Sequence, residues 1–179
     1  MIGNDLVDLH LAQSQSNWKR KGFLEKIFTE EERILIQNSD QKFELVWRLW
    51  SMKESVYKVV VQQEQQRFFN PQKLECRIES DTHGQVSYNH EIYRTFTHQT
   101  KDYIYSTTSE KATTCLYWLS SKKDRISNIA EKLRLEESNI DVIKDSLGIP
   151  NIYYKNKRIT KSMTITNHGR FEVLQFKTY

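Results

Sequence analysis

Apolar residues recur at strand or helix spacing in successive blocks along the chain. Residues 1–9 interleave apolar residues with Asn and Asp, which predicts a short strand that carries Asp5 on the face of Val7. After a polar turn, Thr29 and the acids behind it predict a helix through about Gln37, with Glu32 at capping-box spacing. A longer helix is predicted over 41–62, where one stripe of apolar residues falls at three- and four-residue steps: Phe43, Val46, Trp47, Trp50, Tyr57 and Val61.

The apolar period changes to two between residues 74 and 119. Short segments rich in β-branched and aromatic residues are joined there by turn signals such as 81–84, which predicts an antiparallel sheet. Residues 121–147 return to helical spacing and close at Gly148 and Pro150. Residues 151–179 alternate again and predict two or three strands around a turn at 167–169. This order of elements predicts an α+β fold.

Composition excludes several classes of protein. The chain has 179 residues, 37% hydrophobic and 28% charged, so it can bury a core without the help of a metal or a disulfide. Its two cysteines, Cys76 and Cys115, lie far apart and outside any zinc-ligand spacing. No apolar run approaches the ~18 residues of a membrane span, and the first residues are acidic where a signal peptide is basic, so we expect a cytoplasmic protein. A net charge of +4 argues against a nucleic-acid partner.

Glu54 lies inside the apolar stripe of the 41–62 helix when that helix is projected at ~100° per residue. Burying an ionised carboxylate costs several kcal/mol unless a cation accompanies it. One interpretation is an ion pair within the helix, since Lys58 stands one turn further on. The other interpretation is a bound cation, and the pattern leaves both open.

Asp5 is the other acid on a segment that we expect to be buried. If Asp5 and Glu54 converge, their hard oxygens suit Mg²⁺ together with a substrate phosphate and do not suit zinc. The alternative for Asp5 is an ordinary acid at a strand end. Asp8 falls on the opposite face of a regular strand and ranks below Asp5.

Three segments resemble the motifs of one enzyme family, the 4′-phosphopantetheinyl transferases. They are GNDLVDL at 3–9, IFTEEE at 27–32 and WSMKESVYK at 50–58, in the order found in that family. The resemblance implies a fold of antiparallel sheets packed with helices. It also implies that Asp5 and Glu54 hold Mg²⁺ on the pyrophosphate of coenzyme A, that Lys58 contacts its phosphates and that Lys53 belongs with the substrate-binding residues.

A fourth segment near the end of the chain, TITNHGRF at 164–171, resembles the strand-turn-strand of the family that contacts the phosphates of the coenzyme. Asn167 holds the position of the family's histidine in one alignment, and His168 holds it after a shift of one residue. Arg170 follows as a third candidate contact. The alternative for His168 is an exposed turn residue.

The order of the segments resembles the two-module members of the family with their modules exchanged. We therefore expect two pseudo-symmetric half-modules, 1–120 with the metal site and 121–179 with the basic tail, packed as one unit. One site would lie between them within a single chain. Small members of the family assemble as trimers, so monomer and trimer both stay open.

The chain departs from the family pattern after Lys58, where the usual glycine-containing loop is replaced by VVVQQEQQRFFNPQ. Residues 150–179 carry six basic residues against the single acid Glu172. This charge is either a solvated face or a cluster for the 3′-phosphate of the coenzyme or for an acidic carrier protein.

The implied activity is Mg²⁺-dependent transfer of 4′-phosphopantetheine from coenzyme A to a serine of an acyl or peptidyl carrier protein, with Glu54 and Lys58 as catalytic residues. The alternative is a relative that binds coenzyme A or the carrier without catalysis, which the missing glycine loop would suit.

Overall fold

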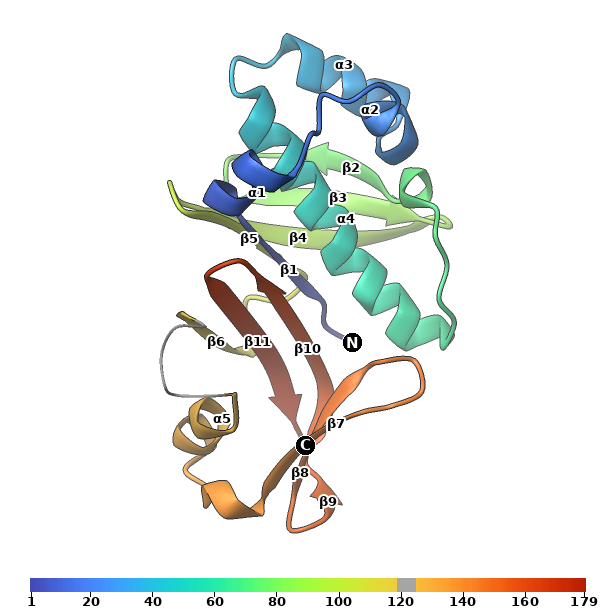
Figure 1. Cartoon of the computed structure of the whole chain (residues 1–179). Coiled ribbons are helices and arrows are strands. Elements are labelled where there is room, and N and C mark those ends of the chain that lie inside the picture. Colours follow the sequence, from blue (N-terminus) through green and yellow to red (C-terminus); the bar gives the residue numbers. More distant parts are fainter. Residues whose placement is uncertain (119–124) are drawn as a thin grey trace.

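The structure is a computed structural model that describes residues 1–118 and 125–179. Three antiparallel sheets and a set of helices make up the described part of the chain, so the predicted α+β class is confirmed. In Figure 1 the N-terminal helices and a five-stranded sheet form the upper part of the molecule, and two smaller sheets form the lower part. The N-terminal strand starts beside the C-terminal hairpin and runs up into the upper part.

Helices α1 and α2 follow the first strand directly. Strand β1 (Asn4–Asp8) ends where the Asp8 side chain accepts hydrogen bonds from the backbone of His10 and Leu11 and so caps α1 (Leu9–Gln15). Helix α2 is also short (Phe23–Ile27). The stretch that the pattern predicts as a polar turn therefore contains two short helices.

The predicted capping box begins α3 (Glu30–Asn38). The Thr29 hydroxyl accepts from the Glu32 amide, and the Glu32 carboxylate accepts from the Thr29 amide at 2.9 Å. Helix α4 (Lys42–Glu64) follows the prediction for 41–62 closely and crosses the five-stranded sheet (Figure 1). It ends at Gln65, whose backbone is left-handed with a φ of 54°.

The first sheet has the order β1-β5-β4-β3-β2, and neighbouring strands are antiparallel. Its later strands are those that the period of two predicts: β2 (Glu75–Ile78), β3 (His83–Tyr88), β4 (Glu91–Gln99) and β5 (Tyr103–Thr107). A single 3-10 turn, η1 (Pro71–Lys73), connects α4 to this sheet. Apolar residues of the sheet and of α4 form the largest core cluster.

The second sheet has the order β10-β11-β6, with β10 (Thr160–His168), β11 (Phe171–Thr178) and β6 (Thr113–Trp118). Strand β6 comes from the segment assigned to the first half-module, yet it pairs with the last strand of the chain. The five-stranded sheet differs from the two three-stranded sheets in strand number and in the helices that accompany it, and the pseudo-symmetry of the halves stays a prediction.

The region between the two parts corrects one prediction. Helix α5 (Arg125–Leu133) forms as expected, whereas residues 121–124 of the predicted helical stretch lie outside the described residues. After the turn η2 (Glu137–Asn139), residues 140–144 form strand β7 (Ile140–Lys144) and not a helix. The reason is pairing: β7 alternates buried and exposed residues against β8 (Pro150–Tyr154), which also pairs with β9 (Lys157–Arg158).

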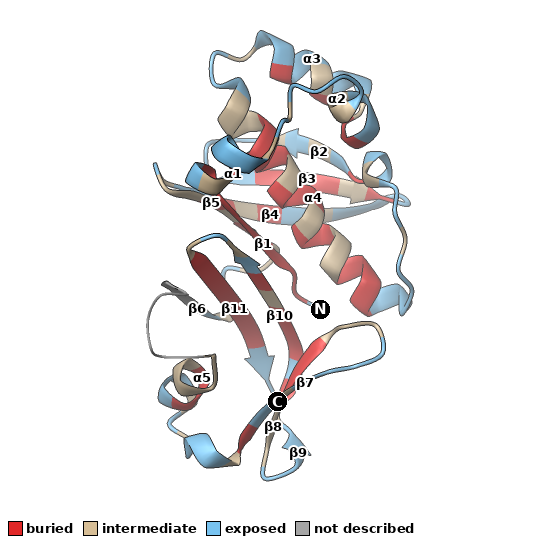
Figure 2. Cartoon of the chain, in the orientation of Figure 1, coloured by how far each residue is buried: buried red, intermediate tan, exposed pale blue. Residues whose placement is uncertain are grey.

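Strand β1 is the joint between the two parts, and it is buried along its whole length (Figure 2). One edge of β1 pairs with β5. Backbone groups of residues 2–8 are bonded to side chains of α4 and β10, which satisfies donors and acceptors that an edge strand would otherwise leave free. A Cβ on Gly3 would overlap the Ser55 carbonyl oxygen, so this glycine allows β1 to lie directly against α4.

Candidate active site at the joint between β1, α4 and β10

Asp5 projects from β1 into the joint and is 8% exposed. Its Oδ1 accepts a hydrogen bond of 3.1 Å from the Thr166 hydroxyl and lies 3.6 Å from the Lys58 ammonium. Its Oδ2 is buried and has no hydrogen-bond partner among the described residues. Burial raises the pKa of Asp5, and the charge of Lys58 and the bond from Thr166 oppose that rise.

Glu54 faces the same joint from α4. Burial raises the pKa of its carboxyl, the charge of Asp5 raises it further, Lys58 opposes in part, and the result is about 7. The Asp5 carboxyl group is therefore near enough to affect the ionisation of Glu54. Together with Lys58 they make a site with more acidic groups than basic ones.

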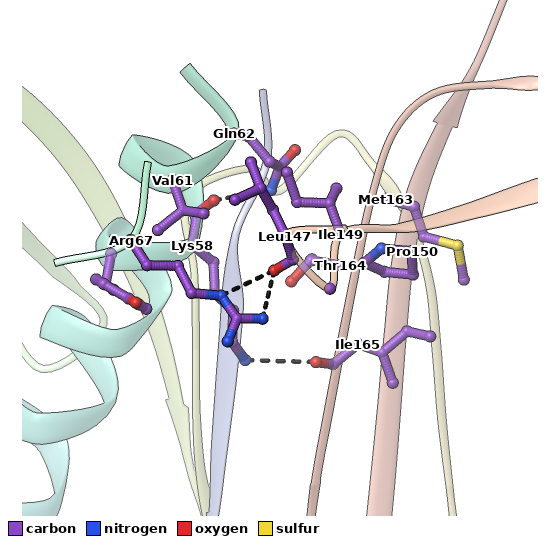
Figure 3. A pocket seen from close by; sticks show the side chains of 12 residues that line it. Lys58, Val61, Gln62, Arg67, Leu147, Ile149, Pro150, Met163, Thr164 and Ile165 are labelled. Carbon is purple, nitrogen blue, oxygen red and sulfur yellow. Dashed lines mark hydrogen bonds between the residues drawn. The ribbon is translucent and has the colours of Figure 1, made fainter. Parts of the chain in front are cut away.

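The Lys58 ammonium does not form the intrahelical pair with Glu54 that spacing allowed. It donates to the Asn4 carbonyl at 2.6 Å and to the Ile165 carbonyl at 3.4 Å, besides its contact with Asp5 (Figure 3). Lys58 thus links the first strand of the chain to β10 within one molecule.

The donor set around Asp5 fits Mg²⁺. The described residues contain no group of three or more His, Cys, Asp and Glu side chains that could hold a metal alone. Mg²⁺ is commonly held by one or two carboxylates together with phosphate oxygens and waters, and Asp5 has an unpartnered buried oxygen beside a second carboxyl group. The arrangement therefore suits a hard cation that arrives with a phosphate ligand.

The even-numbered side chains of β10 form a polar row against the first residues of the chain. Ser162 accepts from the Ile2 amide at 3.0 Å, and Thr164 donates to the side chain of Asn4 at 3.0 Å. Thr166 reaches Asp5, and His168 Nδ1 accepts from the Asp8 amide at 2.9 Å. Because side chains alternate along a strand, this row faces β1 as a unit.

This row shows where the two candidates for the family's histidine position, Asn167 and His168, lie relative to the site. His168 belongs to the row, because its Nδ1 accepts from the Asp8 amide. Asn167 is exposed on the other face, where its side chain lies 3.4 Å from Glu172 of β11. The structure thus brings His168 to the carboxylates and leaves Asn167 outside.

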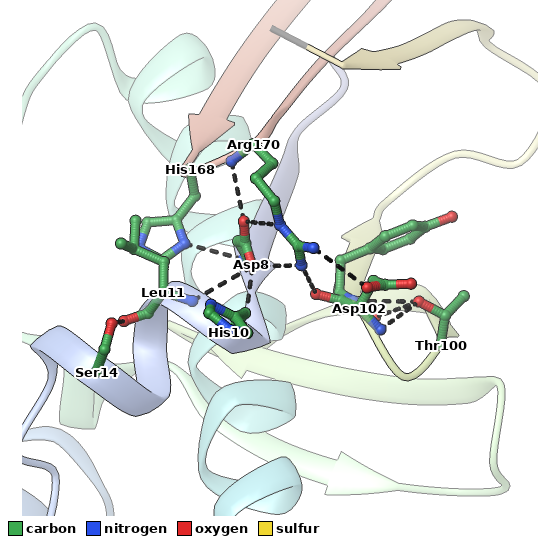
Figure 4. A network of polar contacts seen from close by, with 9 residues as sticks. Asp8, His10, Leu11, Ser14, Thr100, Asp102, His168 and Arg170 are labelled. Atoms are coloured by element: carbon green, nitrogen blue, oxygen red, sulfur yellow. Dashed lines mark hydrogen bonds and ion pairs between the residues drawn. The ribbon is translucent and has the colours of Figure 1, made fainter. Parts of the chain in front are cut away.

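Arg170 is bound to carboxylates in this structure, and its expected role as a phosphate contact stays a prediction. Its backbone amide and Nε each donate to Asp8 Oδ2 at 2.9 Å, and Nη2 donates to Asp8 Oδ1 at 2.9 Å (Figure 4). Nη1 reaches Asp102 at 3.3 Å. Burial raises the pKa of Asp8, but the hydrogen bonds from Arg170 outweigh that effect and lower it to about 2. Arg170 therefore fastens the β10–β11 turn, and with it His168, to the end of β1.

Lys53, which we expected among the substrate-binding residues, lies away from the two carboxyl groups of the site. It is 1% exposed, and its ammonium lies 2.8 Å from Glu32 and donates to the carbonyls of Pro71 and Leu74. Glu32 in turn accepts from the Cys76 amide at 2.7 Å. This buried pair joins α3, α4 and β2 and has no exposed surface to offer a ligand.

A cavity of about 220 Å³ adjoins the site beyond Lys58 (Figure 3). Its lining combines α4, β10 and the turn between β7 and β8, and the sequence patterns missed one residue that contributes to it, Arg67. A second cavity of about 260 Å³ lies beside Glu54, half of its lining residues are aromatic, and Tyr57 borders both cavities. No local signal marks Arg67, because its hydrogen-bond partner, Leu147, lies 80 residues away.

The basic residues of the C-terminal segment do not gather at this site. Lys155, Lys157 and Arg158 are exposed at the β8–β9 turn, at the lower end of Figure 1. Within the two described ranges, no helix is long and apolar enough to cross a membrane.

Comparison with known proteins gives the same family as the motifs. A profile of the family described as ACPS, 4′-phosphopantetheinyl transferase superfamily, matches residues 1–115. Among solved structures, the crystal structure of Thermotoga maritima holo-[acyl-carrier-protein] synthase (AcpS) is similar, with a TM-score of 0.46 and 13% identity over 88% of this chain and 83% of that chain. No curated protein sequence matches the chain significantly. Since the family profile covers well over half of its length, the chain belongs to the 4′-phosphopantetheinyl transferase superfamily.

Proposed function

We propose that this protein transfers 4′-phosphopantetheine from coenzyme A to a serine hydroxyl of an acyl or peptidyl carrier protein in a Mg²⁺-dependent reaction. The observation that carries the proposal is the pair of interacting carboxyl groups, Asp5 and Glu54, beside the Lys58 ammonium at the joint of two segments far apart in the chain. Membership of the superfamily supports coenzyme A and a carrier protein as the two substrates.

Asp5 and Glu54 would hold the Mg²⁺. When bound, the ion neutralises negative charge on the pyrophosphate of the coenzyme, as metal ions do in phosphoryl transfer. Lys58 donates to phosphate oxygens and stabilises the charge that develops there. His168 is a further donor: its Nδ1 accepts the Asp8 amide, so the neutral ring carries its hydrogen on Nε2.

The reaction is a displacement at the β-phosphorus of coenzyme A. The serine oxygen forms a bond to phosphorus, the bond to the bridging oxygen breaks, and adenosine 3′,5′-bisphosphate leaves. Glu54, directly or through a bound water, accepts the serine proton; without the metal its pKa is raised to about 7, within the range of general bases that work at neutral pH. An acidic carrier protein suits the positive net charge of the chain, since such charge mainly raises the association rate.

The proposal is tested by the mass gain of an apo carrier protein with coenzyme A and Mg²⁺. We expect Glu54→Gln to lower the transfer rate by about 10³-fold or more, since it removes both a general base and a metal ligand. Asp5→Asn should act similarly, and Glu64→Gln, at the exposed end of the same helix, should leave the rate unchanged.

Near wild-type transfer by Glu54→Gln would contradict the assigned role. If the wild type binds coenzyme A and Mg²⁺ in calorimetry but produces no mass gain with a panel of carriers, the non-catalytic alternative is favoured instead.

A further inference from the structure

The loop that replaces the family's glycine loop places one arginine over the cavity beyond Lys58. Helix α4 stops at the left-handed residue Gln65, and two residues later the side chain of Arg67 crosses to the turn between β7 and β8 (Figure 3). There its Nε and Nη2 donate to the Leu147 carbonyl at 3.0 and 2.5 Å. Two segments 80 residues apart thereby close one side of the cavity.

The turn that receives Arg67 is shaped for this contact. Asp145 Oδ1 accepts from the amides of Leu147 and Ile149, both at 2.9 Å, which fixes the direction of the Leu147 carbonyl. Gly148 between them has a φ of +79°, and a Cβ there would lie 2.5 Å from Arg67 Nη2. Only glycine therefore allows the guanidinium to lie directly on the turn.

Arg67 differs from the other cations near the site in having no carboxylate partner among the described residues. Lys58 faces Asp5, and Arg170 faces Asp8 and Asp102. Arg67 is hydrogen-bonded to a neutral carbonyl, and within the described residues no carboxylate lies within ion-pair distance of it. The lining of the cavity includes Lys58 and Arg67 and no acidic side chain. This cavity therefore favours an anionic group, in addition to the phosphate expected beside Asp5 and Glu54.

We propose that Arg67 binds the 3′-phosphate of coenzyme A and so makes the protein prefer coenzyme A over 3′-dephospho-coenzyme A. This rests on the proposed function, in which Asp5, Glu54 and Lys58 take the pyrophosphate beside the cavity. The ligand carries a second, separate phosphate on its ribose, and Arg67 lines the same cavity as Lys58 without a carboxylate partner among the described residues. Guanidinium groups bind such phosphomonoesters through paired N–H donors.

The experiment measures binding and not transfer. Dissociation constants of coenzyme A and of 3′-dephospho-coenzyme A are determined by calorimetry with Mg²⁺ for the wild type, Arg67→Gln and Arg67→Lys. The matched control is Arg77→Gln, an exposed arginine on β2. We expect Arg67→Gln to weaken coenzyme A by about 10- to 100-fold, the loss typical of a hydrogen bond to a charged group, and to change 3′-dephospho-coenzyme A by about twofold or less. Arg67→Lys should lie between, and the control should match the wild type.

Two results would overturn the inference. Equal weakening of both ligands by Arg67→Gln would mean that Arg67 only holds the turn, and unchanged affinity for both would mean that it contacts neither. A wild type that binds and discriminates the two ligands but modifies no carrier would overturn the proposed activity and leave the role of Arg67 supported. A wild type that binds neither ligand would overturn both.

Discussion

Lys53 and Glu54 are neighbours on one helix, yet their surroundings are opposite. Lys53 lies 2.8 Å from the buried Glu32, and the polar atoms of that pair are hydrogen-bonded to four backbone groups, those of Thr29, Pro71, Leu74 and Cys76. Glu54 is affected by the charge of Asp5, another acid, Lys58 supplies one ammonium near Asp5, and one Asp5 carboxylate oxygen is left unpartnered. A buried charge whose partners are complete stabilises the fold. A buried excess of one charge sign requires a cation from outside.

The largest effect on stability should come from removing one partner of the buried ion pair between Lys53 and Glu32. Lys53→Met leaves Glu32 buried without its cation and should lower the free energy of unfolding by about 3–5 kcal/mol. The double variant Lys53→Met with Glu32→Gln should recover a large part of this, which urea unfolding of the set would measure. If Lys53→Met instead lost coenzyme A binding at unchanged stability, Lys53 would return to the substrate-binding residues and the contrast with Glu54 would fail.

At the two carboxyl groups, Asp5 and Glu54, removing a charge should raise stability instead of lowering it. The pKa of Glu54 is raised to about 7 in the folded protein from 4.5, so the folded state holds its proton more tightly, and stability without metal falls as pH rises between these values. Above pH 7, Glu54→Gln should therefore be more stable than the wild type by on the order of 2–3 kcal/mol in metal-free buffer. At pH 4.5 the difference should be small.

Thermal unfolding at the two pH values, with and without Mg²⁺, measures this sign. Mg²⁺ should stabilise the wild type more than Glu54→Gln at pH 8, because the ion binds the ionised carboxylate. A difference between the two proteins that does not depend on pH would exclude the ionisation of Glu54 as its cause.

Asp8 and Arg170 form a complete pair that is partly exposed, and they should show the smallest effect. Asp8→Asn keeps a good cap for α1 but removes the charge, so we expect a loss of about 1–2 kcal/mol at pH 7, reduced because the Arg170 side chain is 38% exposed. The pKa of Asp8 is lowered to about 2 from 3.8, so this contribution is present above pH 4 and is lost as pH falls toward 2. Urea unfolding at pH 7 and pH 3 should show the gap shrinking, and a constant gap would exclude the ion pair as its source.

Signals within short stretches of the sequence predicted many of the helices and strands of this protein. The helical stripe of α4, the capping box at Thr29 and the strands between residues 75 and 107 follow from residue periodicity and from side chains that bond their own neighbours. The odd position of Glu54 within the stripe and the motif around Asp5 and Lys58 also lie within single segments. These features could be predicted because their physical causes lie within a few residues of one another.

Tertiary structure determined which charged groups find partners. The partners of Asp5 and Asp8 on β10 and at its turn lie about 160 residues further along the chain, and those of Lys53 and Arg67 lie 18 to 80 residues away. Residues 140–144 became a strand because β8 was available to pair with them. The choice between Asn167 and His168 depended on which face of β10 meets β1. The sequence by itself determined where charged groups enter the core, whereas packing of distant segments determined whether each one is neutralised or left to bind a ligand.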